Sequence, residues 1–446
     1  MFFKKLETEG LAHYSYIVGS NGESIIVDPM RDSNVYLDVF KEEGLKLKYI
    51  FETHRNEDYI SGSKELSEST GAKVLISGHE DLGYEYGEKI YDGDEVEFGE
   101  LIIKGLHTPG HTKGHMAYVL IEKEKDNPYM VFTGDCLFMG DVGRTDFYGK
   151  ENLEEMTGLI YDSIFNKILK LGDGVIVNPA HGNGSACGDS MDERPITTAG
   201  YEGLNNPKLK YTNKDDFIKN HGKMKIKPRY FEKMEICNTK GADFVNCDGE
   251  LKPLKFSEIN SEHTLVDLRS PQAFAESHIP GSYFLSPGNL ASFLGTILDT
   301  ESNLVFIAQD DNLDIIERTY WTARRIGFDN IAGYLKGGVQ GFINSAKDWD
   351  RIKTIRATDY CNLEDKITLD IRGVDNLEEI GKSSEDYYKI PLKVLYKDFD
   401  ILPKDKSIYI LCNSGNTATT AASFLVQRGY DVVVIAGGYQ AVKRLG

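Results

Sequence analysis

The sequence predicts an α/β protein built from three successive domains. In the N-terminal half, four predicted strands each end on, or just before, a loop that bears a histidine or an aspartate. In the C-terminal half, one order of elements occurs twice: strand with Asp-x-Arg, strand, loop, helix, then a strand that closes on Gly-Gly. The length of 446 residues exceeds what one hydrophobic core usually serves. Together these features indicate one α/β domain followed by two copies of another.

The N-terminal half alternates strand and helix patterns. Asn21-Gly22 between two alternating runs is a strong hairpin signal. Apolar runs and helical periodicity define the other elements. In order, we expect strands at 13–20 and 23–29, a helix at 33–44, strands at 47–53, 73–76, 93–98, 100–107 and 127–135, a long amphipathic helix at 151–172, and a strand at 174–181.

The domain boundaries follow from composition. From 196 to 250 the chain is rich in Lys, Asn and Thr, with only sporadic apolar residues, which favours a connector on the surface. The two related units follow it. We therefore predict a first domain at 1–228, a linker at 229–250, a second domain at 251–354 and a third at 355–446.

The charge balance limits the partners. Lys and Arg number 51 against 70 Asp and Glu, which gives a formal net charge of −19. Such a balance repels phosphate backbones and anionic lipid, so we expect neither nucleic acid nor membrane as a partner. The N-terminus lacks the apolar core of a signal peptide, and the six cysteines form no CxxC pair, so we expect reduced thiols in a cytoplasmic protein.

Four motifs indicate a metal site. The segment Thr53–Tyr59 reads THRNEDY, and TPGHTKGH, TGD and PAH follow it in that order. The set resembles the metallo-β-lactamase superfamily, whose first motif is usually THxHxDH and supports two metal ions. The resemblance covers the first domain and implies an αββα sandwich with the metal at its loop edge.

The donors that remain favour a single ion. Asn56 and Tyr59 stand where that motif has its second and last histidines, and an amide or a neutral phenol is a poor donor to zinc or iron. The good donors at matching positions are His54, His111 and Asp135. Two histidines and one carboxylate form the donor set of non-haem iron(II) oxygenases. We therefore expect one Fe(II) per chain.

The persulfide dioxygenase branch of the superfamily looks like this chain in its three metal ligands, in TPGHT and in the GRTDF segment at 143–147. The resemblance implies oxidation of a low-molecular-weight thiol persulfide by O2 to sulfite and free thiol, in a homo-oligomer. Arg144 would either hold the anionic part of the substrate or pair with Asp146. The residues expected beside the metal or at the substrate, rather than on the metal, are Asp58, Tyr59, Arg144, Asp146 and His181.

The two C-terminal units resemble rhodanese domains, with VDLRSPQAFAESHIPGS at 266–282 as the clearest match. In active members a cysteine starts a tight loop at the foot of a helix, where N–H groups stabilise its thiolate and persulfide. In the third domain, Cys412 occupies the position of this cysteine. In the second domain, we assign Gln309 to the same position, and we therefore interpret the second domain as a scaffold. Thr417 stands where the family often has arginine. The predicted sulfur-binding loop comprises Asn413, Ser414, Gly415, Asn416 and Thr417.

Three functions stay open on this evidence. The leading one is an iron persulfide dioxygenase coupled to rhodanese-type sulfur transfer. In it, Cys412 either loads a persulfide for the iron site or combines sulfite with sulfane sulfur to give thiosulfate. The second is a two-zinc thioesterase of the glyoxalase II type, which Asn56 and Tyr59 disfavour. The third is a non-catalytic sulfur-binding or scaffold protein. The motifs do not reveal which thiol carries the sulfur.

Overall fold

The computed structural model describes residues 1–125, 127–185, 187–188, 191–211, 213–245, 251–343, 348–374 and 376–445. The chain divides into two compact units, Met1–Lys225 with Phe231–Cys247, and Ile226–Tyr230 with Asp248–Gly446. Within the described residues, no helix combines the length and the apolar character that crossing a membrane requires.

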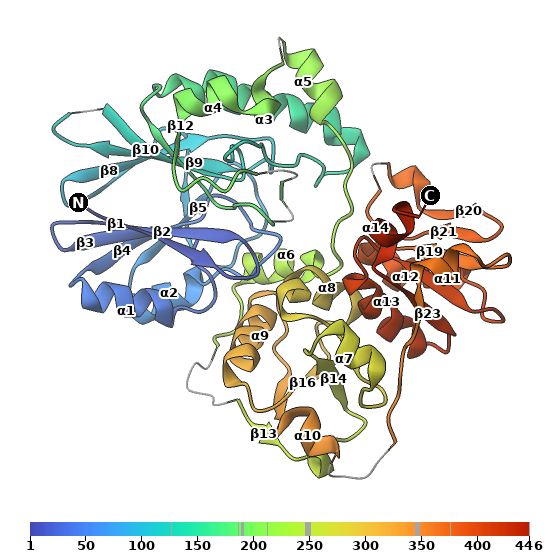
Figure 1. The fold of residues 1–446 in the computed structure, drawn as a ribbon. Coiled ribbons are helices and arrows are strands. Elements are labelled where there is room, and N and C mark those ends of the chain that lie inside the picture. Colours follow the sequence, from blue (N-terminus) through green and yellow to red (C-terminus); the bar gives the residue numbers. More distant parts are fainter. Residues whose placement is uncertain are drawn as a thin grey trace. The chain divides into compact units, whose positions relative to one another are not determined.

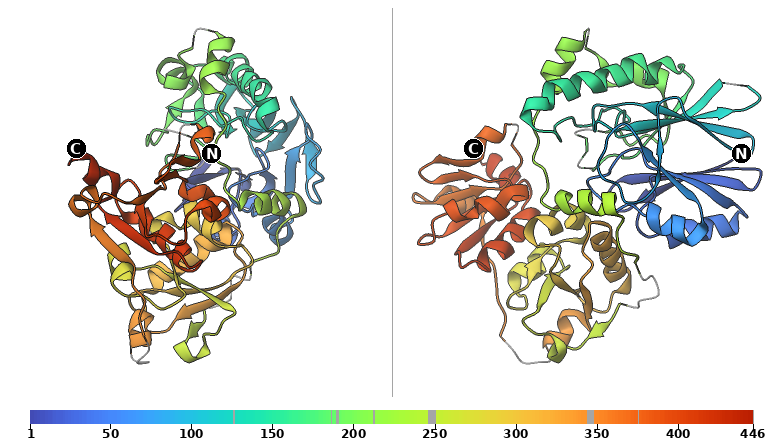
Figure 2. Two further views of the ribbon diagram at one scale, coloured as in Figure 1. Left: turned by 90° about the vertical axis from the view of Figure 1, so that its right-hand side faces the viewer. Right: turned by 180° about the vertical axis from the view of Figure 1, so that it is seen from behind.

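The first unit is a sandwich of two sheets between layers of helices (Figure 1). One sheet has the order β1-β2-β3-β4-β5-β6, and α1 and α2 cover its outer face (Figures 1 and 2). Its strands are β1 (Phe2–Thr8), β2 (His13–Ser20), β3 (Glu23–Val27), β4 (Lys46–Phe51), β5 (Lys73–Ser77) and β6 (Glu88–Ile90). Its helices are α1 (Asn34–Glu42) and α2 (Ser63–Thr70).

The other sheet of the first unit has the order β12-β11-β10-β9-β8-β7, and α3, α4 and α5 lie on its outer side. Its strands are β7 (Glu95–Phe98), β8 (Leu101–His107), β9 (Met116–Glu122), β10 (Asn127–Gly134), β11 (Ile176–Pro179) and β12 (Thr197–Thr198). The helices that follow are α3 (Leu153–Asn166), α4 (Ala199–Asn205), α5 (Lys214–His221) and α6 (Phe231–Lys240).

Side chains alternate along the strands between the two faces of a sheet, and apolar side chains pack on both faces. Along β9, Met116 and Tyr118 join the core between the sheets, whereas Ala117 and Val119 join the core under α3. Successive side chains of a strand point to opposite faces, so a strand buried on both sides is apolar throughout. This explains why 116–121 is a continuous apolar run.

The predicted hairpin is confirmed. Strands β2 and β3 pair antiparallel around a two-residue turn, and Asn21 and Gly22 adopt φ values of 49° and 78°. Positive φ at both central residues is the geometry that Asn-Gly favours. Each of the other elements expected in this half also forms, with ends that shift by a few residues.

The second unit contains two similar sheets, which are parallel except for the antiparallel pair β20 and β21. The first has the order β13-β17-β16-β14-β15. Its strands are β13 (Pro253–Leu254), β14 (His263–Asp267), β15 (Tyr283–Phe284), β16 (Asn303–Ile307) and β17 (Ile331–Leu335). Its helices are α7 (Pro271–Glu276), α8 (Leu290–Ile297), α9 (Leu313–Arg325) and α10 (Gly338–Ile343).

The second of these sheets has the order β18-β23-β22-β19-β21-β20. Its strands are β18 (Lys353–Arg356), β19 (Ile367–Asp370), β20 (Gly381–Ser384), β21 (Tyr387–Lys389), β22 (Ile408–Leu411) and β23 (Val432–Ala436). Its helices are α11 (Ala357–Cys361), α12 (Leu395–Asp398), α13 (Asn416–Val426) and α14 (Gly438–Lys443). In both sheets the strand with Asp-x-Arg pairs in parallel with the strand that precedes the Ala308 or Cys412 position, β14 with β16 and β19 with β22, which confirms the repeat.

The segment expected to be a linker contains structure. Residues 231–240 form α6, and this helix groups with the first unit. Phe231, Met234 and Asn238 are its buried residues. Residues 246–250 of the expected linker lie outside the described residues. The boundaries at 228, 250 and 354 stay predictions.

Candidate metal centre and sulfur-binding loop

The predicted metal ligands converge at one edge of the sandwich. His54 follows β4, His111 lies between β8 and β9, and Asp135 follows β10. Nε2 of His54 lies 3.9 Å from Oδ2 of Asp135. Nε2 of His111 lies 3.5 Å from the same oxygen. Two imidazoles and one carboxylate thus present one atom each to a common point.

The far nitrogen of each imidazole is held by the protein. Nδ1 of His54 lies 2.9 Å from the hydroxyl of Thr53, which donates to Asp28 at 2.8 Å. Nδ1 of His111 lies 2.9 Å from the carbonyl oxygen of Arg144. Such contacts fix the tautomer and the ring orientation of metal-binding histidines, and leave Nε2 as the donor.

Several buried polar atoms at this point lack a partner. Among the described residues, no hydrogen bond reaches Nε2 of His111 or Oδ2 of Asp135, and both side chains are fully buried. Orphaned buried polar atoms are rare and costly unless an ion or water satisfies them. This arrangement fits a metal ion. The other atoms in the same condition nearby are Asn56 Oδ1, Glu57 Oε2, Asp58 Oδ1 and Tyr59 Oη.

The protonation of two of the three ligands, His54 and Asp135, suits a cation. Burial lowers the pKa of His54 well below its ordinary value, so its imidazole is neutral. Burial raises the pKa of Asp135, but the neighbouring imidazoles of His181 and His111 outweigh burial and hold that pKa well below its ordinary value. Neutral imidazole and ionised carboxylate are the forms that bind metals.

His181 lies between two carboxylates. Its Nδ1 donates to Oδ1 of Asp135 at 2.7 Å, and its Nε2 lies 3.0 Å from Oδ2 of Asp58. Burial lowers the pKa of His181, but Asp135 and Asp58 outweigh it and raise the pKa well above its ordinary value. The ring of Tyr59, fully buried, lies 6.3 Å from that of His181. The structure thus brings Asp58, Tyr59 and His181 together beside Asp135.

Arg144 pairs with Asp146. Its Nε and Nη2 donate to the two carboxylate oxygens at 2.7 and 2.8 Å, and both residues are buried. Such a bidentate pair occupies one full edge of the guanidinium. Of the two roles that the sequence left open for Arg144, the geometry therefore favours the salt bridge. Its backbone carbonyl also orients His111.

Three residues reach the site without a signal in the motifs. Donor atoms of His54, Glu57 and His111 lie within 4.8 Å of one another, and so do those of Asp58, His181 and Cys187. Cys187 is 1% exposed, and its sulfur lies close to the donor atoms of the metal cluster. Its position six residues after His181 would have been the only clue.

The third is Asn238 on α6. Its Nδ2 donates to the carbonyl oxygens of Asn56 and Tyr59 at 2.6 and 2.7 Å. Its Oδ1 accepts from the backbone N–H of Ser61 at 2.8 Å. One amide thus holds the backbone of the loop that follows His54.

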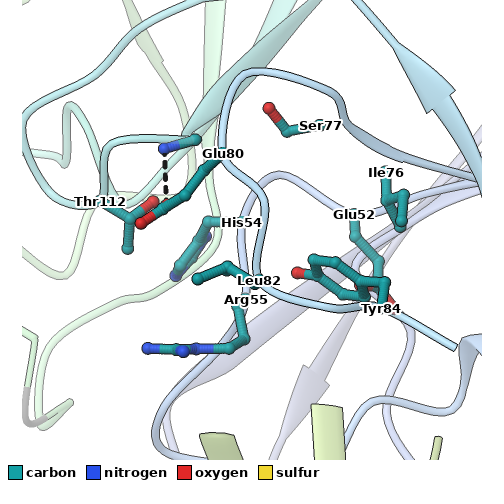
Figure 3. A pocket seen from close by; sticks show the side chains of 10 residues that line it. Glu52, His54, Arg55, Ile76, Ser77, Glu80, Leu82, Tyr84 and Thr112 are labelled. Carbon is teal, nitrogen blue, oxygen red and sulfur yellow. Dashed lines mark hydrogen bonds between the residues drawn. The ribbon is translucent and has the colours of Figure 1, made fainter. Parts of the chain in front are cut away.

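A pocket of about 260 Å³ opens beside His54 (Figure 3). Arg55 and Glu80 are among its charged residues, and the side chain of Arg55 is 16% exposed. The pocket therefore places charges of both signs beside His54. The complete lining comprises Glu52, His54, Arg55, Ile76, Ser77, Glu80, Leu82, Tyr84, Thr112 and Gly114.

Cys412 starts the loop between β22 and α13. The N–H of Gly415 donates to its sulfur at 3.0 Å, and Gly415 adopts a φ of 98° at the foot of the helix. Cys412 is 2% exposed, whereas Asn413, Ser414 and Asn416 are exposed. A backbone N–H directed at sulfur beside a helix N-terminus stabilises a thiolate or its persulfide.

The second domain has alanine, not Gln309, at the position of Cys412. The N–H of Val339 donates to the carbonyl oxygen of Ala308, as that of Tyr439 donates to Cys412. The prediction that Gln309 occupies the position of Cys412 was therefore wrong by one residue, because the sequence pattern does not define the register of the strands. The absence of a cysteine at this position stands.

Comparisons with known proteins agree with this architecture. Residues 8–181 match the model of the metallo-beta-lactamase superfamily, and residues 254–345 and 368–445 match that of the rhodanese-like domain. A solved structure described as a metallo-beta-lactamase from Staphylococcus aureus subsp. aureus COL is 30% identical, with a TM-score of 0.67 over 76% of this chain and 98% of its own. The chain belongs to the metallo-beta-lactamase superfamily. In this member, rhodanese-like domains follow the metallo-beta-lactamase domain.

Curated relatives of the metallo-beta-lactamase domain carry two different names. "Persulfide dioxygenase ETHE1, mitochondrial" of Bos taurus is 33% identical over 176 residues. "Hydroxyacylglutathione hydrolase" of Francisella philomiragia is 32% identical over 171 residues. Each match spans 38% of this chain and 63% of the relative. The similarity supports an enzyme with a metal site, and identity alone does not separate the two activities.

Proposed function

We propose that the protein is a mononuclear iron(II) persulfide dioxygenase coupled to sulfur transfer. The observation that carries this proposal is the convergence of His54 Nε2, His111 Nε2 and Asp135 Oδ2 on one point, with both opposite nitrogens anchored. This donor set is that of iron(II) oxygenases with open positions. Iron(II), when bound, supplies the electron transfer to O2 that no side chain here can supply. The resemblance to named persulfide dioxygenases supports the choice of substrate.

The overall reaction balances with water as co-reactant. A thiol persulfide, R–S–SH, with O2 and H2O gives R–SH and sulfite: the S–S bond breaks, the outer sulfur is oxidised, and O2 is reduced. The side chains here bind and orient. Asp58 and His181 hold the Asp135 carboxylate in place, and His54 remains a neutral donor. Arg55, in the pocket beside His54, would attract an anionic part of the thiol carrier.

We further propose that Cys412 carries sulfane sulfur. Its persulfide can react with sulfite, Cys–S–SH with SO3²⁻ giving Cys–SH and thiosulfate, a transfer that needs no oxidant. The support is the Gly415 N–H directed at Cys412 Sγ. Thr417 provides no cation in this loop, so the helix N-terminus has to supply most of the stabilisation.

The experiment is metal analysis and O2 uptake on anaerobically purified protein. We expect one iron per chain and O2 consumption that depends on a low-molecular-weight persulfide. His111→Ala should lose both, because it removes a donor. His79→Ala, an exposed histidine of the same unit, is the matched control and should keep both. Persulfide-dependent O2 uptake by His111→Ala at the unaltered rate would contradict the proposal.

One observation favours a second candidate, a two-metal thioesterase of the hydroxyacylglutathione hydrolase kind. Asp58, His181 and Cys187 form a second cluster of donor atoms beside the first. A carboxylate, an imidazole and a thiolate are good zinc ligands. Two metals per chain, with hydrolysis of an acyl-thiol ester in the absence of O2, would replace the first proposal by this one.

A further inference from the structure

Glu57 is a buried carboxylate at the metal centre that no motif assigns. It lies three residues after His54, in the loop that follows β4, and its side chain is 0% exposed. Its Oε2 lies 3.8 Å from Nε2 of His111, the nitrogen that faces the metal position. Donor atoms of Glu57, His54 and His111 lie within 4.8 Å of one another. The carboxylate thus lies beside the metal-facing nitrogens of the two histidine ligands.

The protein itself neutralises Glu57 only in part. Among the described residues, no hydrogen bond reaches its Oε2. Its Oε1 lies 3.5 Å from Nη2 of Arg55, and Glu235 lies at the same distance from that nitrogen. A buried carboxylate without full compensation is strongly destabilising. A cation at the His54–His111 position would satisfy the free oxygen.

The neighbouring residue explains why a carboxylate matters here. Asn56 occupies a position where the superfamily usually has a histidine, and its Oδ1 also lacks a hydrogen bond among the described residues. An amide oxygen is a weak donor to iron or zinc, whereas a carboxylate is a good one. The loop thus loses one donor at Asn56 and presents another at the next residue.

We propose that Glu57 is a fourth protein donor to the ion of the His54, His111 and Asp135 site. The inference rests on the metal site of the proposed function but not on turnover of persulfide. Two carboxylates balance the charge of a divalent ion, so the loaded site is neutral. An ion held by four protein donors would still be able to bind further ligands.

The test uses Co(II) as the probe, because its visible absorption reports its ligands. Three variants of the full chain are compared with the wild type: Glu57→Gln, Glu57→Asp and Glu235→Gln. Glu235→Gln removes the other carboxylate beside Arg55 and is the matched control. We expect both Glu57 variants to weaken Co(II) binding by at least about tenfold, since even residues that only orient a ligand cost roughly 10–100-fold. Both should also change the Co(II) spectrum, and the control should change neither.

Glu57→Asp separates ligation from charge balance. It keeps the charge but shortens the side chain by one methylene. If Glu57 served only as a counter-charge, Glu57→Asp would keep the wild-type affinity and spectrum while Glu57→Gln lost affinity, and the proposal would be wrong. Unchanged binding by both variants would overturn it as well. Melting of the metal-free proteins checks folding, and if Glu57→Gln does not fold, Glu57→Asp decides alone.

The outcomes also distinguish this inference from the proposed function. A wild type that binds Co(II) with the expected dependence on Glu57, but does not oxidise persulfide once loaded with iron, would overturn the function and support the fourth donor. If the wild type oxidises persulfide but neither Glu57 substitution changes the Co(II) spectrum, the proposed function would be supported and the fourth donor would be overturned. A wild type that binds no metal would overturn both.

Discussion

A single amide supports the loop on which the metal ligands depend. Asn238 is 1% exposed and satisfies two carbonyl oxygens and one N–H of the segment 56–61. That segment lacks regular hydrogen-bonded structure of its own over most of its length. Its backbone conformation, and with it the direction of Glu57 and Asp58, therefore depends on a helix far along the chain.

Asn238→Ala should destabilise the metal-free protein by about 1–3 kcal/mol, because buried backbone groups lose their partners. It should also weaken metal binding by roughly 10–100-fold, the cost typical of groups that orient metal ligands. Urea unfolding and competition with a chelator measure the two effects. Asn220→Ala, at an exposed helix position, is the control and should change neither. Full metal affinity in Asn238→Ala would show that the loop keeps its geometry without the amide.

Among the elements, α14 contacts the start of the loop that connects β22 to α13, and this contact shapes the sulfur-binding loop. Gly438 begins α14 with a φ of +56°, and a Cβ there would lie 2.3 Å from the carbonyl oxygen of Cys412. That carbonyl accepts the N–H of Tyr439 at 2.7 Å. The close approach of two backbones thus sets the start of the loop, and only glycine permits it.

Gly438→Ala should therefore displace Cys412 and lower sulfur transfer from thiosulfate to a thiol acceptor to the level of Cys412→Ser. The control is Gly429→Ala, which has a φ of +80° but nothing within 4 Å of the added carbon. Both variants carry backbone strain of about 1–3 kcal/mol, but only Gly438→Ala adds the clash. If both variants lost sulfur transfer to the same extent, backbone strain alone, and not the contact with Cys412, would explain the loss.

For the whole molecule, metal binding and stability are linked in one unit only. Among the described residues, the unpartnered donor atoms at the metal position, those of His111 and Asp135, lie in the first unit, whereas Cys412 lies in the second. An ion that binds the folded state alone stabilises it by about 4 kcal/mol when its concentration is 1,000 times its Kd. The two units have separate cores, so they can respond separately.

Removal of the metal by a chelator should lower the thermal transition of the first unit and leave that of the second unchanged. Scanning calorimetry of the full chain, with and without metal, measures both transitions. His111→Ala should remain at the chelated value whether or not metal is added. A shift of both transitions by the same amount would show that the units unfold as one.

The sequence alone determined the residues whose chemistry is carried by local pattern. The proximity of His54, His111 and Asp135 could be predicted because each follows a strand in a recognisable motif, and the carboxyl ends of such strands meet at one edge. Cys412 and its loop could be predicted for the same reason. Asn21-Gly22 defined its hairpin because a two-residue turn has few solutions.

Only the tertiary structure decided what distant segments contribute. Asn238 holds the carbonyl of Asn56 across 182 residues of sequence, within a stretch whose composition suggested a linker. Cys187 and Glu57 face the metal position because of where their loops fold back, and Ala308 rather than Gln309 matches Cys412 because of strand register. Periodicity and motifs report neighbours along the chain. Contacts between remote loops depend on how the layers pack, which local pattern does not encode.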